Sequence, residues 1–195
     1  MSEWSNYFKN TQNDPPNALL LKALPYVTTG KTALDLGAGA LVDAKYLAKQ
    51  GFTVMAVDSA KEMLAIKLKD KEMDGAIART DMTYAQYFKE FPDASFDLVT
   101  AQWALSFELP RHFDDLITNI RKALKPGGIF TGNIYGPKHS WAAGRASMTF
   151  MHPFDYEHYF LPPWQIIYSE EVEEDKLAAV GDMTHWHHYK FILRK

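Results

Sequence analysis

The chain has 195 residues, 47% of them apolar, and a formal net charge of −3. This apolar content suffices for one core, so residues 1–195 are expected to form a single domain. The absence of cysteine excludes disulfides, thiolate metal sites and a cysteine nucleophile. No apolar run has the length of a membrane span and the start, MSEWSNYFKN, is unlike a signal peptide, so we expect a cytoplasmic protein without a membrane partner. No dense Lys/Arg cluster favours nucleic acid as a partner.

Residues 1–28 are expected to form an N-terminal cap and helix. The turn signal Asn13-Asp14-Pro15-Pro16 leads into a helix at Asn17–Tyr26. In chain order we then expect a strand at Thr32–Leu36, a helix at Val42–Gln50, a strand at Thr53–Val57, a helix from Asp58-Ser59 through Lys69, strands at Ile77–Thr80 and Phe96–Ala101, a helix at Phe113–Leu124 and a strand at Gly128–Ile134. Strands that alternate with helices predict an α/β fold with a mostly parallel, doubly wound sheet.

The end of the chain breaks this alternation. Two strands are expected there, at Gln165–Val172 and His185–Leu193, joined by an acidic loop. Residues 135–163 form an insertion between the fifth strand and this ending.

A glycine-containing loop follows the first predicted strand. Gly37 and Gly39 allow the backbone to turn sharply and to approach a ligand closely, because glycine has no Cβ. Asp58 ends the next strand, 21 positions after Gly37, and at this spacing a carboxylate can accept hydrogen bonds from ribose hydroxyls. The pattern predicts a site for a nucleoside cofactor.

Two features of the loop discriminate between cofactors. A dinucleotide loop places a small residue where this chain has Val42, which is β-branched and stiff. Asp35 precedes the loop, and its charge would repel a diphosphate but suits the cationic end of S-adenosylmethionine (SAM). A nicotinamide-dependent oxidoreductase stays as the alternative from another enzyme class.

The loop resembles motif I of the class I SAM-dependent methyltransferases, although Leu41 stands where that pattern has its last glycine. The segment Ala78–Met82 resembles the family's third motif. This resemblance implies that Asp81 binds the adenine amine and that the backbone of Met82 meets an adenine ring nitrogen. Residues 95–100 and 124–128 resemble the strand-four motif and the turn before strand five.

The resemblance implies a Rossmann-like, seven-stranded sheet that is mostly parallel and has an antiparallel C-terminal strand. It also implies SAM as the cofactor and a small molecule as the methyl acceptor. A non-catalytic SAM-binding protein is a further alternative, in which Leu41 would indicate a motif I loop that has degenerated. The aromatic N-terminus and the closing Thr184-His185-Trp186-His187 resemble, more loosely, a small bacterial branch of unassigned or tellurite-resistance-type methyltransferases.

Further site residues are predicted outside these motifs. Gln102 and Trp103 leave strand four at the sheet edge where ligands of open α/β sheets bind, and we assign them to the cofactor site. Methyltransferases often build substrate pockets from insertions such as 135–163, so Trp141 and Arg145 are predicted to contact the acceptor. Tyr7 is assigned to the same role, because the N-terminal aromatics are expected to fold over the cofactor as a lid.

The histidines near the C-terminus suggest a metal site as an alternative to a polar hairpin. His185 and His187 would share one face of a strand, with His188 on the other, and several glutamates lie near in sequence. Spacing alone fixes no third ligand, so no metal is expected. No general base stands out either, and the catalytic residues stay unassigned.

Overall fold

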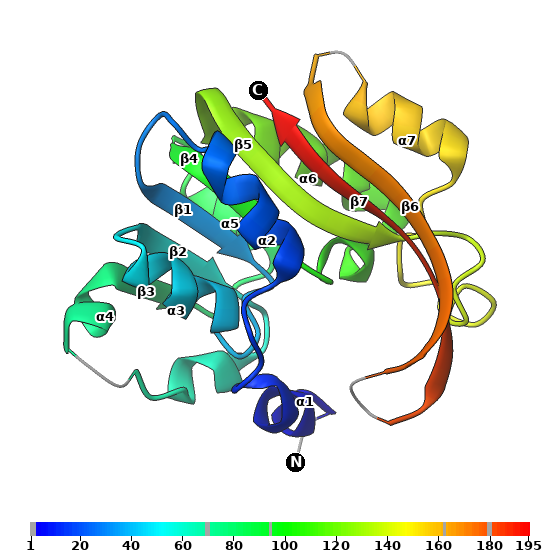
Figure 1. The fold of residues 1–195 in the computed structure, drawn as a ribbon, viewed down its shortest axis with the longest axis horizontal. Coiled ribbons are helices and arrows are strands. Elements are labelled where there is room, and N and C mark those ends of the chain that lie inside the picture. The colour runs from blue at the N-terminus through cyan, green and yellow to red at the C-terminus, as the bar shows by residue number, and fades with distance from the viewer. Residues whose placement is uncertain (1–2, 69–70, 94, 162, 179–180) are drawn as a thin grey trace.

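The computed structural model describes residues 3–68, 71–93, 95–161, 163–178 and 181–195. Its centre is a seven-stranded sheet in the order β3-β2-β1-β4-β5-β7-β6 (Figure 1). The strands are β1 (Thr32–Leu36), β2 (Thr53–Val57), β3 (Ile77–Thr80), β4 (Phe96–Ala101), β5 (Leu124–Tyr135), β6 (Gln165–Leu177) and β7 (Met183–Arg194). The strands β1 to β5 pair in parallel, and β7 pairs antiparallel to both β5 and β6. The predicted Rossmann-like fold is confirmed.

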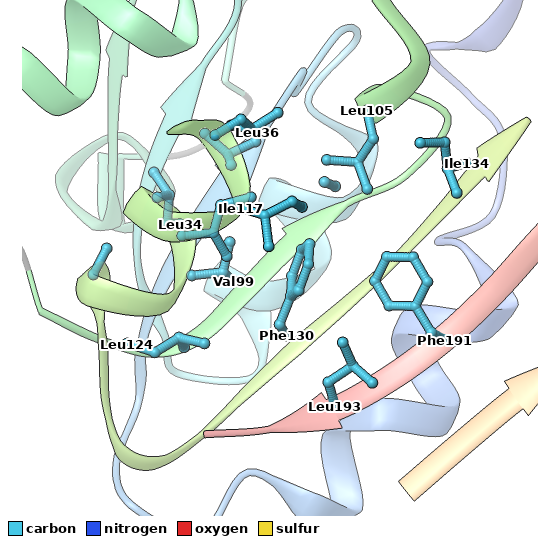
Figure 2. Close-up of a cluster of buried hydrophobic side chains, with 14 of the residues drawn as sticks. Leu34, Leu36, Val99, Leu105, Ile117, Leu124, Phe130, Ile134, Phe191 and Leu193 are labelled. Atoms are coloured by element: carbon cyan, nitrogen blue, oxygen red, sulfur yellow. The ribbon is translucent and has the colours of Figure 1, made fainter. Parts of the chain in front are cut away.

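Successive residues of the central strands are buried on opposite faces of the sheet. In β1, Ala33 belongs to one apolar cluster and Leu34 to the other, and both side chains are fully buried. Figure 2 shows the second cluster, where Leu34, Phe130 and Phe191 of three different strands gather. Because both faces are covered, these strands are mostly apolar, as expected for a parallel sheet.

Helices cover the two faces separately. The cluster that contains Ala33 packs against α2 (Ala18–Ala23) and α3 (Val42–Lys49), and Met73 of α4 (Lys71–Ala76) joins it. The opposite cluster is covered by helices α5 (Tyr84–Glu90), α6 (Phe113–Ala123) and α7 (Pro153–Phe160). Short 3-10 helices lie at Leu24–Tyr26, Lys61–Ala65, Leu105–Phe107 and Pro110–His112. Within the described ranges, no helix is long and apolar enough to cross a membrane.

The helix predicted from Asp58-Ser59 through Lys69 is wrong. A 3-10 helix at Lys61–Ala65 takes its place, the backbone is extended at Ile66, and residue 69 lies outside the described residues. Met63 is fully buried, and Ile66 packs against the same cluster, so the apolar pattern serves packing without continuing a helix. Nη1 of Arg79 donates a 2.8 Å hydrogen bond to the carbonyl oxygen of Ile66, which offsets the lost helical partner.

The predicted acidic loop near the C-terminus is also wrong, because its acidic residues lie within a strand. Glu173 and Glu174 belong to β6, which continues to Leu177 and pairs with β7 along its whole length. Figure 1 shows this hairpin extending beyond the rest of the sheet. Across the two strands, Lys190 pairs with Glu170, and His185 contacts Glu173 and Asp175. Such cross-strand pairs stabilise a segment whose acidic composition suggested a loop.

The N-terminal residues form a helix that the sequence did not indicate. Helix α1 (Glu3–Thr11) lies apart from the two helical layers, near the edge of the sheet toward which β1 and β5 point (Figure 1). Its Phe8 is only 7% exposed and packs in the same apolar cluster as Ala38 and Leu41 of the glycine loop. Residues 1–28 therefore contain two α-helices, α1 and α2, where one was expected.

Candidate cofactor and acceptor site

The carboxyl ends of the parallel strands meet at one edge of the sheet. The backbone N–H of Gly37 donates to the carbonyl oxygen of Val57 at 2.8 Å, and that of Asp58 donates to Thr80 at 3.2 Å, so the three strand exits are tied together. The residues predicted for the cofactor all lie at the ends of β1 to β4, namely Asp35, Gly37, Gly39, Asp58, Asp81, Met82, Gln102 and Trp103. Topology thus gathers side chains that are up to 68 positions apart in sequence.

Both glycines of the loop have left-handed backbone conformations, with φ of 72° at Gly37 and 49° at Gly39. A Cβ on Gly37 would lie 2.4 Å from the Cβ of Ala104 and 3.0 Å from the hydroxyl of Tyr84. Such contacts are far inside van der Waals distance, so the backbone turn requires glycine at this position.

The carboxylate of Asp58 stabilises the same loop. Its Oδ2 accepts a 2.8 Å hydrogen bond from the N–H of Gly39, and its Oδ1 accepts one of 2.8 Å from Ala60. Burial raises the pKa of Asp58, and these two N–H groups oppose the rise. Each carboxylate oxygen has a second lone pair, so Asp58 can hold the loop and still accept from a ligand.

Leu41 occupies a left-handed conformation with φ 60° and ψ 26°, as a glycine would. For a non-glycine residue this costs about 1–2 kcal/mol. The Leu41 side chain is fully buried, and burying a leucine contributes about 1.5–3 kcal/mol. The packing of Leu41 in the apolar cluster beneath α2 and α3 therefore offsets its backbone strain, and the loop forms without its last glycine.

Asp35 is a buried acid next to this loop. Its side chain is 3% exposed, and no described residue gives its Oδ2 a hydrogen bond. Burial raises the pKa of Asp35 well above its usual range, with Asp43 and Asp58 adding to the rise, while the N–H of Ala44 opposes it. Burial also raises the pKa of Asp43 to about 6. A buried group of acids of this kind is stabilised by a cation and destabilised by an anion.

Gln102 and Trp103 are held by a buried amide. Trp103 has a φ of 57°, and its N–H donates to Oδ1 of Asn133 at 2.6 Å. Nδ2 of Asn133 donates to Oε1 of Gln102 at 3.3 Å, and Asn133 is only 2% exposed. A left-handed Trp is uncommon, and backbone strain of this kind is typical of binding sites.

Three residues that the sequence did not identify support this edge. Tyr84 fills the space beside Gly37, and its hydroxyl donates to the carbonyl oxygen of Ala104 at 3.4 Å. Asp43 accepts from the N–H of Asn17 at 2.8 Å, which joins α2 to α3. Asn133 is the third. No sequence pattern marks them, because each acts across 20 or more positions.

The adenine assignment stays a prediction. Asp81 is exposed just beyond β3, and Met82 is half-buried against the apolar cluster of α5 and α6. A short helix follows at Tyr84, and it begins with a capping box between Thr83 and Gln86. This cap fixes the path of the chain directly after Asp81 and Met82.

The predicted acceptor residues lie around the same edge. Tyr7 of α1 would be 3.9 Å from a Cβ on Gly39, so it lies over the glycine loop. Trp141 follows β5, with its ring centroid 5.6 Å from that of Tyr135. The guanidinium of Arg145 lies 4.2 Å from the centroid of the Trp141 ring, a distance typical of a cation–π contact.

The methyltransferase domain family matches residues 34–131, from β1 into β5. The chain belongs to this family. This membership separates it from the nicotinamide-dependent oxidoreductases, which the sequence left as an alternative.

Relatives differ in how much of the chain they cover. The uncharacterized methyltransferase sll0829 of Synechocystis is 29% identical over 148 residues, which are 74% of this chain and 64% of the relative. A ubiquinone biosynthesis O-methyltransferase of Aliivibrio fischeri is 34% identical over 103 residues, or 51% of this chain and 42% of the relative. The chain thus spans less than two thirds of the length of these curated methyltransferases.

Solved structures of methyltransferases share the fold. TehB from Haemophilus influenzae superposes with a TM-score of 0.75 at 18% identity, covering 98% of this chain and 67% of TehB. The 1,6-didemethyltoxoflavin-N1-methyltransferase of Burkholderia thailandensis gives a TM-score of 0.68 at 17% identity, covering 100% of this chain and 91% of that protein. That structure contains 1,6-didemethyltoxoflavin and S-adenosylhomocysteine (SAH). At such identities the likeness concerns the fold alone.

Two of the C-terminal histidines of this methyltransferase-family chain, His185 and His187, have carboxylate partners. His185 contacts Asp175 at 2.8 Å, and Nε2 of His187 lies 2.8 Å from Glu171. Nδ1 of His187 accepts from the N–H of Lys138 at 3.1 Å. In the part of the chain that the structure describes, no three His, Asp or Glu side chains are grouped to hold a metal ion.

Proposed function

We propose that this protein transfers a methyl group from SAM to a small-molecule acceptor. The observation that carries the proposal is the unpartnered, buried carboxylate oxygen of Asp35 beside the glycine loop. A sulfonium and an α-ammonium would supply the missing positive charge. A diphosphate would add negative charge to a site that already contains Asp35, Asp43 and Asp58.

Each part of SAM has a candidate partner at this edge. We assign Asp58 to the ribose hydroxyls, and Asp81 with Met82, one strand further, to the adenine. We assign the methionine part to the loop of Gly37 and Gly39, with Gln102 and Trp103 next to it. The residues present therefore fit this cofactor.

For this reaction, the main role of the protein is to position the acceptor and SAM. When bound, SAM supplies a methyl group that its sulfonium has already activated, and the acceptor's lone pair displaces SAH in one step. The protein orients the acceptor with its nucleophilic atom about 3–3.5 Å from the methyl carbon. An acceptor that starts protonated also loses its proton, which requires a hydrogen-bond acceptor nearby.

Oxygen and nitrogen are the acceptor atoms that the relatives' names suggest. Curated relatives include ubiquinone biosynthesis O-methyltransferases and a phosphoethanolamine N-methyltransferase of Caenorhabditis elegans. We extend to this chain only the shared class, a methyl acceptor with an O–H or N–H group.

We expect SAM and SAH to raise the melting temperature of the protein, and NAD to leave it unchanged. A ligand at a hundred times its dissociation constant adds about 2.7 kcal/mol to the free energy of unfolding. A thermal-shift series with the three ligands measures this. Stabilisation by NAD alone would overturn the proposal. Mass spectrometry detects whether SAH forms when candidate acceptors are added. If SAM binds but no acceptor yields SAH, a non-catalytic SAM-binding protein is favoured instead.

Replacing Asp81 by alanine is expected to reduce the preference for adenosine over inosine in the cofactor. A hydrogen bond from the adenine amine to a carboxylate contributes about 1.5–3 kcal/mol, so the preference should fall about tenfold or more. Calorimetry with SAH and S-inosylhomocysteine measures it. Asp93→Ala is the control, because Asp93 is exposed near the opposite end of β4. An unchanged preference would place the adenine elsewhere.

A further inference from the structure

Six aromatic and imidazole rings gather beside the predicted cofactor site. This aromatic cluster consists of Trp103, Tyr135, His139, Trp141, Trp186 and His188. Trp103 follows β4, and Tyr135 ends β5. His188 of β7 pairs with Tyr135, and Trp186 lies two residues before it in the same strand. The cluster thus lies at the same edge of the sheet as the glycine loop, and Trp103 belongs to both sites.

His139 has one partnered and one unpartnered nitrogen. Its Nδ1 accepts a 3.1 Å hydrogen bond from the N–H of Trp141. Its Nε2 is buried and has no partner among the described residues, and the side chain is 2% exposed. Burial lowers the pKa of His139 to about 4, helped by His185, His187 and Arg145, so the ring is neutral near pH 7. With Nδ1 accepting, the proton is on Nε2, which can donate to a ligand.

His188 has no partner on either nitrogen within the described part of the chain, although it is also 2% exposed. Its ring centroid lies 4.9 Å from that of Trp103. Burial lowers the pKa of His188 to about 4; the charges of Lys190, His139 and His187 lower it further, and Glu170 opposes them. A neutral imidazole offers one donor and one acceptor, and His188 has both available.

The neighbouring histidines of the same strand behave differently. His185 and His187 point to the other face of β7, where carboxylates partner both of them. An unsatisfied polar group that is buried costs about 1–3 kcal/mol. A protein needing only a filled core at positions 139 and 188 would be more stable with apolar side chains there. The unpartnered nitrogens therefore indicate a ligand.

We propose that His139 and His188 bind the methyl acceptor, and that this acceptor is a planar aromatic or heteroaromatic molecule. It has a hydrogen-bond acceptor next to its nucleophilic O–H or N–H, so that one imidazole donates to the first group and the other accepts from the second. This inference rests on the proposed methyl transfer and adds to it the substrate class and two positioning residues.

The composition of the cluster favours an aromatic ligand. The ring centroids of Trp103 and Trp186 are 5.3 Å apart and those of His139 and Tyr135 are 4.2 Å apart, so these rings pack against one another. A further ring that packs against them gains about 0.5–1.5 kcal/mol beyond area burial. The rings of Trp103, Trp141 and Trp186 are half-buried, so the cluster is not sealed from solvent.

The test compares two matched probes on the protein saturated with SAH. Catechol is planar and has an acceptor oxygen next to an O–H, and cis-1,2-cyclohexanediol has the same groups on a saturated ring. We expect catechol to bind and the diol to bind at least about tenfold more weakly. His188→Phe keeps an aromatic ring without nitrogen, and it should weaken catechol about tenfold, which corresponds to about 1.4 kcal/mol.

Three controls separate the possible causes. The affinity for SAH and the melting temperature should not fall in His188→Phe, since phenylalanine removes an unsatisfied polar group. His188→Gln should recover part of the catechol affinity, and His185→Phe, on the opposite face of β7, should leave it unchanged. In the parent protein, the imidazole ¹⁵N signals of His139 and His188 should shift when catechol is added, a readout that does not depend on any variant folding.

The outcomes are distinct. If SAH fails to bind the parent protein, the proposed function itself is wrong. If SAH binds and catechol does not, or catechol binds equally to His188→Phe without shifting the ¹⁵N signals, the acceptor site is overturned and methyl transfer stands. A loss of SAH affinity in His188→Phe would assign His188 to the cofactor and also overturn the inference.

Discussion

Replacing Asp58 by alanine is expected to weaken SAH binding about tenfold or more, with the overall fold intact. A carboxylate that accepts from both ribose hydroxyls makes charge-assisted hydrogen bonds, each contributing about 1.5–3 kcal/mol. The structure adds a second contribution, because the same carboxylate accepts from the N–H groups of Gly39 and Ala60. The alanine variant therefore loses both a ligand contact and a support of the loop. Calorimetry with SAH measures the change.

The asparagine variant separates these two contributions. Asp58→Asn keeps one acceptor oxygen for Gly39 or Ala60 but removes the charge, so its SAH affinity should lie between those of the parent and Asp58→Ala. The control is again Asp93→Ala, which should bind SAH like the parent. Equal SAH affinity for parent and Asp58→Ala would show that the ribose is bound elsewhere.

Deleting residues 1–12 is expected to reduce SAH affinity and turnover in a protein that still melts cooperatively. The deletion removes α1, whose Phe8 would lie 3.6 Å from a Cβ on Gly39 and whose Trp4 contacts Phe107 at 5.5 Å between ring centroids. This helix thus connects the glycine loop to the exit of β4, across the predicted cofactor site. Burial raises the pKa of Tyr7, with Asp14, Asp58 and Asp43 adding to the rise.

Single substitutions distinguish a lid from packing. Phe8→Ala removes a buried ring and should lower the melting temperature, since such changes cost about 3–5 kcal/mol when fully buried. Tyr7→Ala should leave the melting temperature nearly unchanged and weaken SAH or the acceptor, because Tyr7 is half-buried over the loop. A truncated protein with the parent's SAH affinity and turnover would mean that α1 serves packing alone.

The bounds of the first strands and the position of the glycine loop could be predicted from the amino-acid sequence. Mostly apolar runs such as Thr32–Leu36 and Thr53–Val57 became β1 and β2 with the predicted bounds, because strands buried on both faces are rich in apolar residues. Gly37 and Asp58 were identifiable from local residue types and spacing, since a left-handed turn and a strand-end carboxylate each depend on a few neighbouring residues.

Predictions from local sequence patterns were wrong where contacts outside the segment determine its structure. The apolar residues from Met63 to Ile66 suggested a helix, but packing on α3 and a hydrogen bond from Arg79 favour a single 3-10 turn. The acidic residues Glu173 and Glu174 suggested a loop, but pairing with β7 makes them part of a strand. Both outcomes depend on partners 12 or more positions away.

Only tertiary contacts explain why Leu41 is tolerated in a left-handed conformation. They also explain why two buried histidines have ring nitrogens without a hydrogen-bond partner. Leu41 keeps a conformation suited to glycine because a buried apolar layer stabilises its side chain. The sequence suggested His188 only as part of a possible metal site, and the pairing of β5 with β7 buries it beside Trp103. Hydrogen-bond satisfaction of a buried side chain depends on every element around it, so no local pattern contains that information.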